Sequence, residues 1–80
     1  MKRHKFLGSC STTSEKFCVM GVDLFKYNWT TIGDVVIVLD PQTKTPKSFS
    51  AYKIDLGDRA MMFIAGKLDE NYWGFYEYNQ

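Results

Sequence analysis

The stretch Tyr72-Trp73-Gly74-Phe75-Tyr76-Glu77-Tyr78 places five aromatic residues within seven positions near the end of the chain. Aromatic residues favour strands, and in a strand successive side chains point to opposite faces. An extended conformation therefore puts Trp73 and Phe75 on one face, which we expect to be buried. Tyr72, Tyr76 and Tyr78 then lie on the other face. We predict that this second face, the tyrosine row, is available for contact with a partner.

The sequence before this stretch predicts three further strands of an antiparallel meander. Residues 35–39 are a continuous run of Val, Ile and Leu between turn-forming residues, which is typical of a strand buried on both faces. Residues 48–56 alternate in polarity, and residues 60–65 form another apolar run. The segment 56–58 lies between these two strands and contains a glycine, which favours a tight hairpin loop.

The first third of the chain fits two patterns. Residues 5–10 predict a strand, and residues 16–27 carry apolar side chains at both helical and alternating spacing. Gly21 and several poor helix formers favour strand in that second segment. We therefore predict an all-β fold, a small antiparallel meander or partly open barrel of five to six strands. The alternative is an α+β fold with a four- to five-stranded antiparallel sheet and one helix near residues 14–27.

The composition is that of one small folded domain spanning residues 1–80. The chain is 45% hydrophobic and 16% aromatic, which is too rich in large side chains for a disordered protein. Its formal net charge is +1, so the whole molecule gives no strong case for a polyanionic partner. The basic residues that do cluster lie in residues 1–5, which we predict to form a mobile basic arm.

The sequence lacks the combinations of residues that catalysis and metal binding need. His4 is the only histidine, and it lies in the basic arm, so a serine or cysteine nucleophile would have no positioned base. The two cysteines, Cys10 and Cys18, form no C-x-x-C pair, and no glycine-rich phosphate loop occurs. We predict a protein that is not an enzyme, with reduced cysteines and neither a metal nor another cofactor.

No stretch of the sequence has the features of a membrane or export segment. The longest apolar runs are far shorter than the roughly 20 residues that a membrane-spanning helix needs. The basic start of the chain is not followed by the apolar segment of a secretory signal. The expected location is therefore the cytoplasm, with no membrane partner.

Two functions fit these features. The first is a non-catalytic protein-interaction module, such as a small inhibitor, adaptor or accessory subunit, because tyrosine and tryptophan dominate protein interfaces. Its contacts are predicted to be Tyr72, Tyr76, Tyr78 and Trp29. If the aromatic strand is the last of the sheet, its edge is also free to pair with another protein or with a second copy.

The alternative function is single-stranded nucleic-acid binding by a small β-barrel. In such proteins bases stack on aromatic rings while basic residues follow the phosphates. The tyrosine row would supply the rings, and the basic contacts would be Lys2, Arg3, Lys5, Lys44 and Lys47. This alternative is less favoured, because nine acidic residues nearly cancel ten basic ones.

Overall fold

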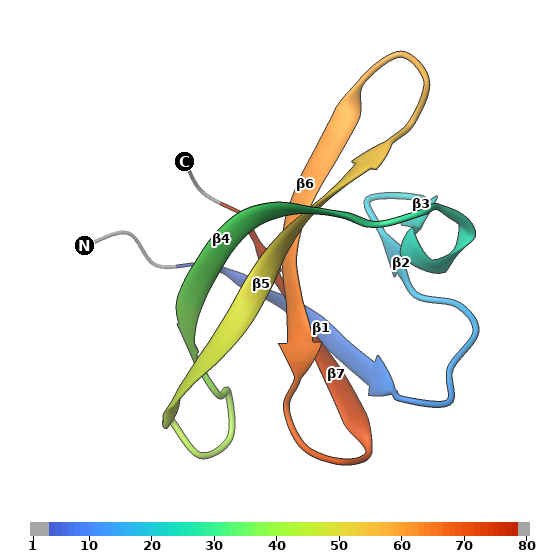
Figure 1. The fold of residues 1–80 in the computed structure, drawn as a ribbon. Helices are drawn as coiled ribbons and strands as arrows, with labels where there is room; N and C mark the ends of the chain where they lie inside the picture. The colour runs from blue at the N-terminus through green and yellow to red at the C-terminus, as the bar shows by residue number, and fades with distance from the viewer. Residues whose placement is uncertain (1–3, 79–80) are drawn as a thin grey trace.

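The computed structural model describes residues 4–78, which form strands and one short 3-10 turn (Figure 1). The expected all-β fold is confirmed. The elements are β1 (Phe6–Ser11), β2 (Cys18–Val19), β3 (Val22–Asp23), η1 (Leu24–Lys26), β4 (Thr30–Leu39), β5 (Pro46–Asp55), β6 (Ala60–Lys67) and β7 (Tyr72–Glu77). Within the described residues, no helix is long and apolar enough to cross a membrane.

The main sheet has five antiparallel strands in the order β1-β7-β6-β5-β4. The meander from β4 to β7 is confirmed, and so is a strand near residues 5–10. The sheet is strongly curved but does not close into a barrel, so β1 and β4 are its two edges (Figure 1). The aromatic strand β7 is not the last strand of the sheet, so the condition for a free edge there is not met. β1 returns from the start of the chain and pairs along the free side of β7.

The alternative of a helix near residues 14–27 is wrong, and the strand favoured for residues 16–27 forms only as two short strands, β2 and β3. Met20 and Gly21 both have positive φ angles, 51° and 78°, and they turn the chain between the two-residue strands β2 and β3. The Asp23 carboxylate then accepts hydrogen bonds from the backbone N–H groups of Phe17 and Phe25, at 3.2 and 3.1 Å. These bonds start η1 and end the hairpin, because a capping carboxylate satisfies N–H groups that the helix leaves free.

One face of the sheet is covered by this hairpin and η1. Phe75 is fully buried there, and its ring stacks on Phe17 with centroids 4.4 Å apart. Trp29 packs edge-to-face on Phe63 at 4.9 Å and donates its indole N–H to the Leu24 carbonyl at 2.8 Å. The prediction that the Trp73 and Phe75 face is buried is therefore confirmed for Phe75, and Trp73 packs against the same cluster.

The other face encloses a second cluster, built from Val38, Phe49, Ala51, Ile64 and Tyr76. It depends on a glycine in β6. A Cβ atom at Gly66 would lie 2.5 Å from the Phe49 ring, so only glycine lets that ring rest on the backbone. Because the sheet curves, this face is concave, and β4 lies near the C-terminal end of β7. This arrangement positions the candidate site.

Candidate functional site at the open edge of the sheet

The three tyrosines predicted to form one exposed row do not share an environment. Tyr76 is only 2% exposed and packs edge-to-face on Phe49 with centroids 5.8 Å apart. Tyr72 is 50% exposed, and Tyr78 is partly buried. The three side chains lie on the same face of the strand, as expected, but the curvature of the sheet buries Tyr76 in the middle of the row. The expectation of a continuous exposed tyrosine face is therefore wrong.

The other predicted contact residues do not gather beside the tyrosines. Trp29 belongs to the opposite face, where its ring stacks on Phe25 at 5.6 Å. Lys47 donates to the Leu68 carbonyl at 2.9 Å and lies 3.9 Å from an Asp40 carboxylate oxygen, so its ammonium group is already bonded. Lys44 is exposed in the turn between β4 and β5.

The predicted basic arm falls partly outside the described residues, which exclude Lys2 and Arg3. Within it, His4 and Lys5 contact the end of β7. A ring nitrogen of His4 lies 3.3 Å from the Glu77 carbonyl, and the Lys5 carbonyl accepts from the Glu77 N–H at 2.8 Å. The start of the chain therefore runs beside the last strand.

The residues that stand out are in β4, where the prediction of a strand buried on both faces is wrong. Val35, Ile37 and Leu39 are 73%, 60% and 53% exposed, whereas Val38 between them is 4% exposed. An edge strand of a half-covered sheet has one buried face, and alternate side chains extend to solvent. A continuous apolar run hides this alternation, so the periodicity of the sequence does not reveal it.

The backbone of these three residues also points outward. Leu39 is opposite Pro46 in the β4–β5 ladder, and proline has no N–H group. Leu39 and Pro46 therefore form a pair that does not exchange two hydrogen bonds, and the backbone groups of Leu39 point away from β5. Hydrogen-bonded and non-hydrogen-bonded pairs alternate along an antiparallel ladder, so the backbone groups of Val35 and Ile37 point the same way as those of Leu39. Their N–H and C=O groups face away from β5. Among residues 4–78, no strand pairs with that side of β4. We call these outward backbone groups and their exposed side chains the β4 edge.

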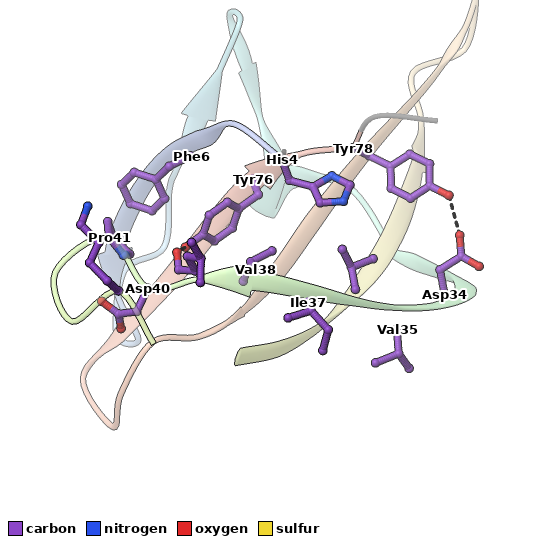
Figure 2. Close-up of a pocket in the computed structure, with 13 residues that line it drawn as sticks. His4, Phe6, Asp34, Val35, Ile37, Val38, Asp40, Pro41, Tyr76 and Tyr78 are labelled. Carbon is purple, nitrogen blue, oxygen red and sulfur yellow. Dashed lines mark hydrogen bonds between the residues drawn. The ribbon is translucent and has the colours of Figure 1, made fainter. Parts of the chain in front are cut away.

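A groove runs beside the β4 edge (Figure 2). Its volume is about 990 Å³, and the opposite wall comes from the start of the chain and the end of β7. Figure 2 shows the rings of Tyr76 and Tyr78 on one side of β4 and the side chains of Val35 and Ile37 on the other. The lining residues are His4, Phe6, residues 34–41, Lys44, Tyr76 and Tyr78. We call this feature the β4 groove.

Two tyrosine hydroxyls, one from Tyr76 in β7 and one from Tyr78 just after β7, bridge the groove to β4. The Tyr76 hydroxyl donates to the Leu39 carbonyl at 2.7 Å, which agrees with an outward-facing carbonyl. The Tyr78 hydroxyl donates to the Asp34 carboxylate at 2.5 Å. These two bonds hold β4 at both ends of its exposed apolar segment, and they leave the segment between them open.

The two carboxylates of the groove, Asp34 and Asp40, are engaged in structural contacts. The Asp34 hydrogen bond raises the pKa of Tyr78, while burial and the charge of Asp40 raise the pKa of Tyr76. Both phenols are therefore neutral donors at pH 7. Backbone N–H groups of Thr43 and Gln42, at 3.1 and 2.8 Å, lower the pKa of Asp40. The walls combine apolar surface with side-chain polar groups that are already hydrogen-bonded and with the outward backbone groups of the β4 edge, an arrangement suited to binding.

The two cysteines lie away from this site and are free thiols. Cys10 is partly buried, and burial raises the pKa of its thiol. Cys18 is exposed. Among residues 4–78, no three potential metal ligands of the types His, Cys, Asp and Glu come together.

Comparisons of this chain with protein-family models, with curated proteins and with solved structures gave no match. The geometry of the β4 edge and groove is therefore the basis for the function proposed below.

Proposed function

We propose that this protein is a non-catalytic interaction module that binds an extended strand of a protein partner along the β4 edge. The observation that carries the proposal is the coincidence of two features at Val35, Ile37 and Leu39. Their backbone groups face away from the sheet, and their apolar side chains are exposed. An added strand would use both, since main-chain hydrogen bonds supply affinity and alternate side chains supply selectivity.

The sequence of the exposed segment 35–39 supports the same proposal. Natural edge strands usually carry a charge, a proline or a bulge that prevents pairing with another chain. The irregularity in the β4–β5 ladder lies between Thr31 and Val35, before the exposed segment. Residues 35–39 themselves contain neither a charge nor a proline. An unprotected edge of this kind is expected where pairing is the function.

A non-catalytic role and a cytoplasmic location are part of the proposal. The groove offers Asp34 and Asp40 as its carboxylates, and both already accept structural hydrogen bonds. The free thiols of Cys10 and Cys18 suit a reducing compartment.

The nucleic-acid alternative has weaker support. It needs aromatic faces that bases can reach, whereas Tyr76 is buried and the Trp29 ring is stacked on Phe25. It also makes a distinct prediction, because binding that releases counterions weakens steeply with salt. A strand added to an apolar edge has no such dependence.

The test compares two substitutions of exposed apolar residues by lysine. Ile37→Lys places a charge in the middle of the β4 edge, and the fold should tolerate it because lysine is common on edge strands. Met20→Lys is the matched control, since Met20 is 80% exposed in the β2–β3 turn. Circular dichroism checks that both variants fold.

The measurement is affinity capture from the source cells followed by amide hydrogen exchange of the captured complex. We expect Ile37→Lys to lose a partner that the wild type and Met20→Lys retain. In the complex, the amides of Val35, Ile37 and Leu39 should become protected. Retention of every partner by Ile37→Lys, or protection confined to other strands, would contradict the proposal.

A further inference from the structure

We infer that the strand that docks on the β4 edge is β4 of a second copy of this chain, paired antiparallel about a two-fold axis at Ile37. The inference rests on the function proposed above and specifies its partner. An interface of this type is isologous, so the same residues must face one another from both copies. The exposed segment meets that condition.

The segment is nearly the same when read in either direction. Around Ile37, the order Val-Val-Ile-Val-Leu places an apolar residue at each of the five positions. Antiparallel pairing about Ile37 sets Val35 opposite Leu39 of the second copy, and Ile37 opposite Ile37 of the second copy. β-branched and apolar residues are favourable cross-strand partners. The exposed side chains of both copies then form one continuous apolar band.

The backbone orientation agrees with this register. In an antiparallel ladder, residues that exchange two hydrogen bonds must both point toward the neighbouring strand. Val35, Ile37 and Leu39 all point outward, and the proposed register pairs only these residues with one another. The Leu39 carbonyl already accepts from Tyr76 at 2.7 Å, and a carbonyl oxygen has a second lone pair for the new bond.

Neighbouring registers are worse for identifiable reasons. A shift by two positions in one direction brings Gly33 opposite Leu39, which replaces a side-chain contact by a glycine without one. A shift by two in the other direction brings Pro41 opposite Val35, and proline cannot donate to the ladder. The register centred on Ile37 is therefore the one that keeps all the apolar pairs.

The charges at the ends of the segment make a testable contribution. In this register Asp34 lies opposite Asp40 of the second copy. Both carboxylates already accept hydrogen bonds within their own chain, Asp34 from Tyr78 and Asp40 from Gln42 and Thr43. Asp34 is exposed, whereas Asp40 is 7% exposed, so salt screens the remaining repulsion mainly from the Asp34 side. Added salt should therefore leave the dimer unchanged or strengthen it.

The experiment measures the oligomeric state of the full chain by sedimentation equilibrium. A single strand pair is small beside a standard interface of roughly 1,600 Å², so we expect a dimer that dissociates in the range of about 1 μM to 1 mM. Ile37→Lys should raise the dissociation constant by about 100-fold, because it removes apolar contact and opposes two like charges on the axis. Met20→Lys should dimerise as the wild type does.

A mixing experiment tests the two-fold axis itself. Ile37→Lys and Ile37→Glu should each self-associate more weakly than the wild type, and an equimolar mixture of the two should form a heterodimer because opposite charges then face each other. Native mass spectrometry distinguishes the heterodimer from either variant alone. Failure of the mixture to associate would overturn this register and the inference with it.

Other outcomes separate this inference from the proposed function. A wild type that stays monomeric at about 1 mM, or an Ile37→Lys variant that dimerises as tightly as the wild type, would overturn the inference. So would a dimer that weakens steeply with salt. If the protein is monomeric but Ile37→Lys still loses a captured partner, the proposed function is retained, and the strand that docks on the β4 edge belongs to another protein. If neither property responds to Ile37→Lys, both fail.

Discussion

The bond between the Tyr76 hydroxyl and the Leu39 carbonyl provides a direct measure of what holds β4 beside β7. Tyr76→Phe removes only the oxygen atom and leaves the ring, which is packed on Phe49 at 5.8 Å. The substitution therefore tests the 2.7 Å hydrogen bond with little change in packing. It affects one end of the β4 edge without altering the residues that form that edge.

The expected loss follows from the surroundings of the bond. A hydrogen bond of this kind contributes about 0.5–1.5 kcal/mol to the free energy of unfolding, and more is lost when a partner stays buried without water. The bond is part-buried, and Leu39 as a residue is 53% exposed, so we place the loss inside this range and not above it. We therefore expect the variant to lose about 1 kcal/mol of stability.

Urea unfolding measures this loss, with Tyr72→Phe as the matched control. With an m-value of about 1 kcal/mol/M for a domain of this size, the Tyr76→Phe midpoint should fall by about 1 M. Tyr72 is 50% exposed, so Tyr72→Phe should change stability by less than about 0.5 kcal/mol. Equal midpoints for the two variants, or an unchanged midpoint for Tyr76→Phe, would refute the reasoning.

Two further predictions concern the second core and the β4–β5 turn. Gly66→Ala should lower the free energy of unfolding by about 1–3 kcal/mol, since its Cβ would lie 2.5 Å from the Phe49 ring. In urea unfolding, Gly66→Ala should cost less stability in a Phe49→Leu background than in the wild type. An equal loss of stability in both backgrounds would argue against the steric cause. Asp40 has a lowered pKa in the folded protein. Its negative charge therefore stabilises the fold at pH values above the ordinary aspartate pKa of about 3.9. This stabilisation is lost as the pH falls through the lower pKa of the folded state. Asp40→Asn should therefore lower the thermal unfolding midpoint at pH 7, and the difference in midpoint from the wild type should shrink as the pH falls. A difference in midpoint that stays constant down to about pH 2 would contradict the stabilising role of the Asp40 charge. Asp58→Asn is the control, because it removes one charge from an exposed loop.

The strands and turns that depend on local pattern could be predicted from the sequence. The meander from β4 to β7 follows from apolar runs separated by turn residues, and the fully buried Phe75 follows from strand alternation. Residues 16–27 resisted the same approach. There the deciding contacts are the Asp23 carboxylate to Phe17 and Phe25, and a carboxylate that joins three parts of a loop leaves no periodic signal.

The candidate site depended on contacts between distant segments, and local patterns do not encode those. Nothing in the aromatic stretch indicates that β1 pairs with it, and this pairing makes β7 internal. Burial of Tyr76 and exposure of Ile37 both follow from which strands become the edges. One local signal was present: Pro46, opposite Leu39, indicates the orientation of the β4 backbone once the hairpin register is known.

The pairing of the first strand with the last has a consequence for how the chain folds during synthesis. Phe6 is opposite Tyr76, so β1 has no ladder partner until β7 has left the ribosome. Pairing of residues so far apart in sequence is slow, because a large loop must close first. The complete sheet can therefore form only after residues 72–77 have been synthesised and released from the ribosome exit tunnel. A messenger that stops before residue 72 would yield a chain in which β1 and β6 both lack the neighbour they share, and such a fragment is a substrate for proteolysis and aggregation.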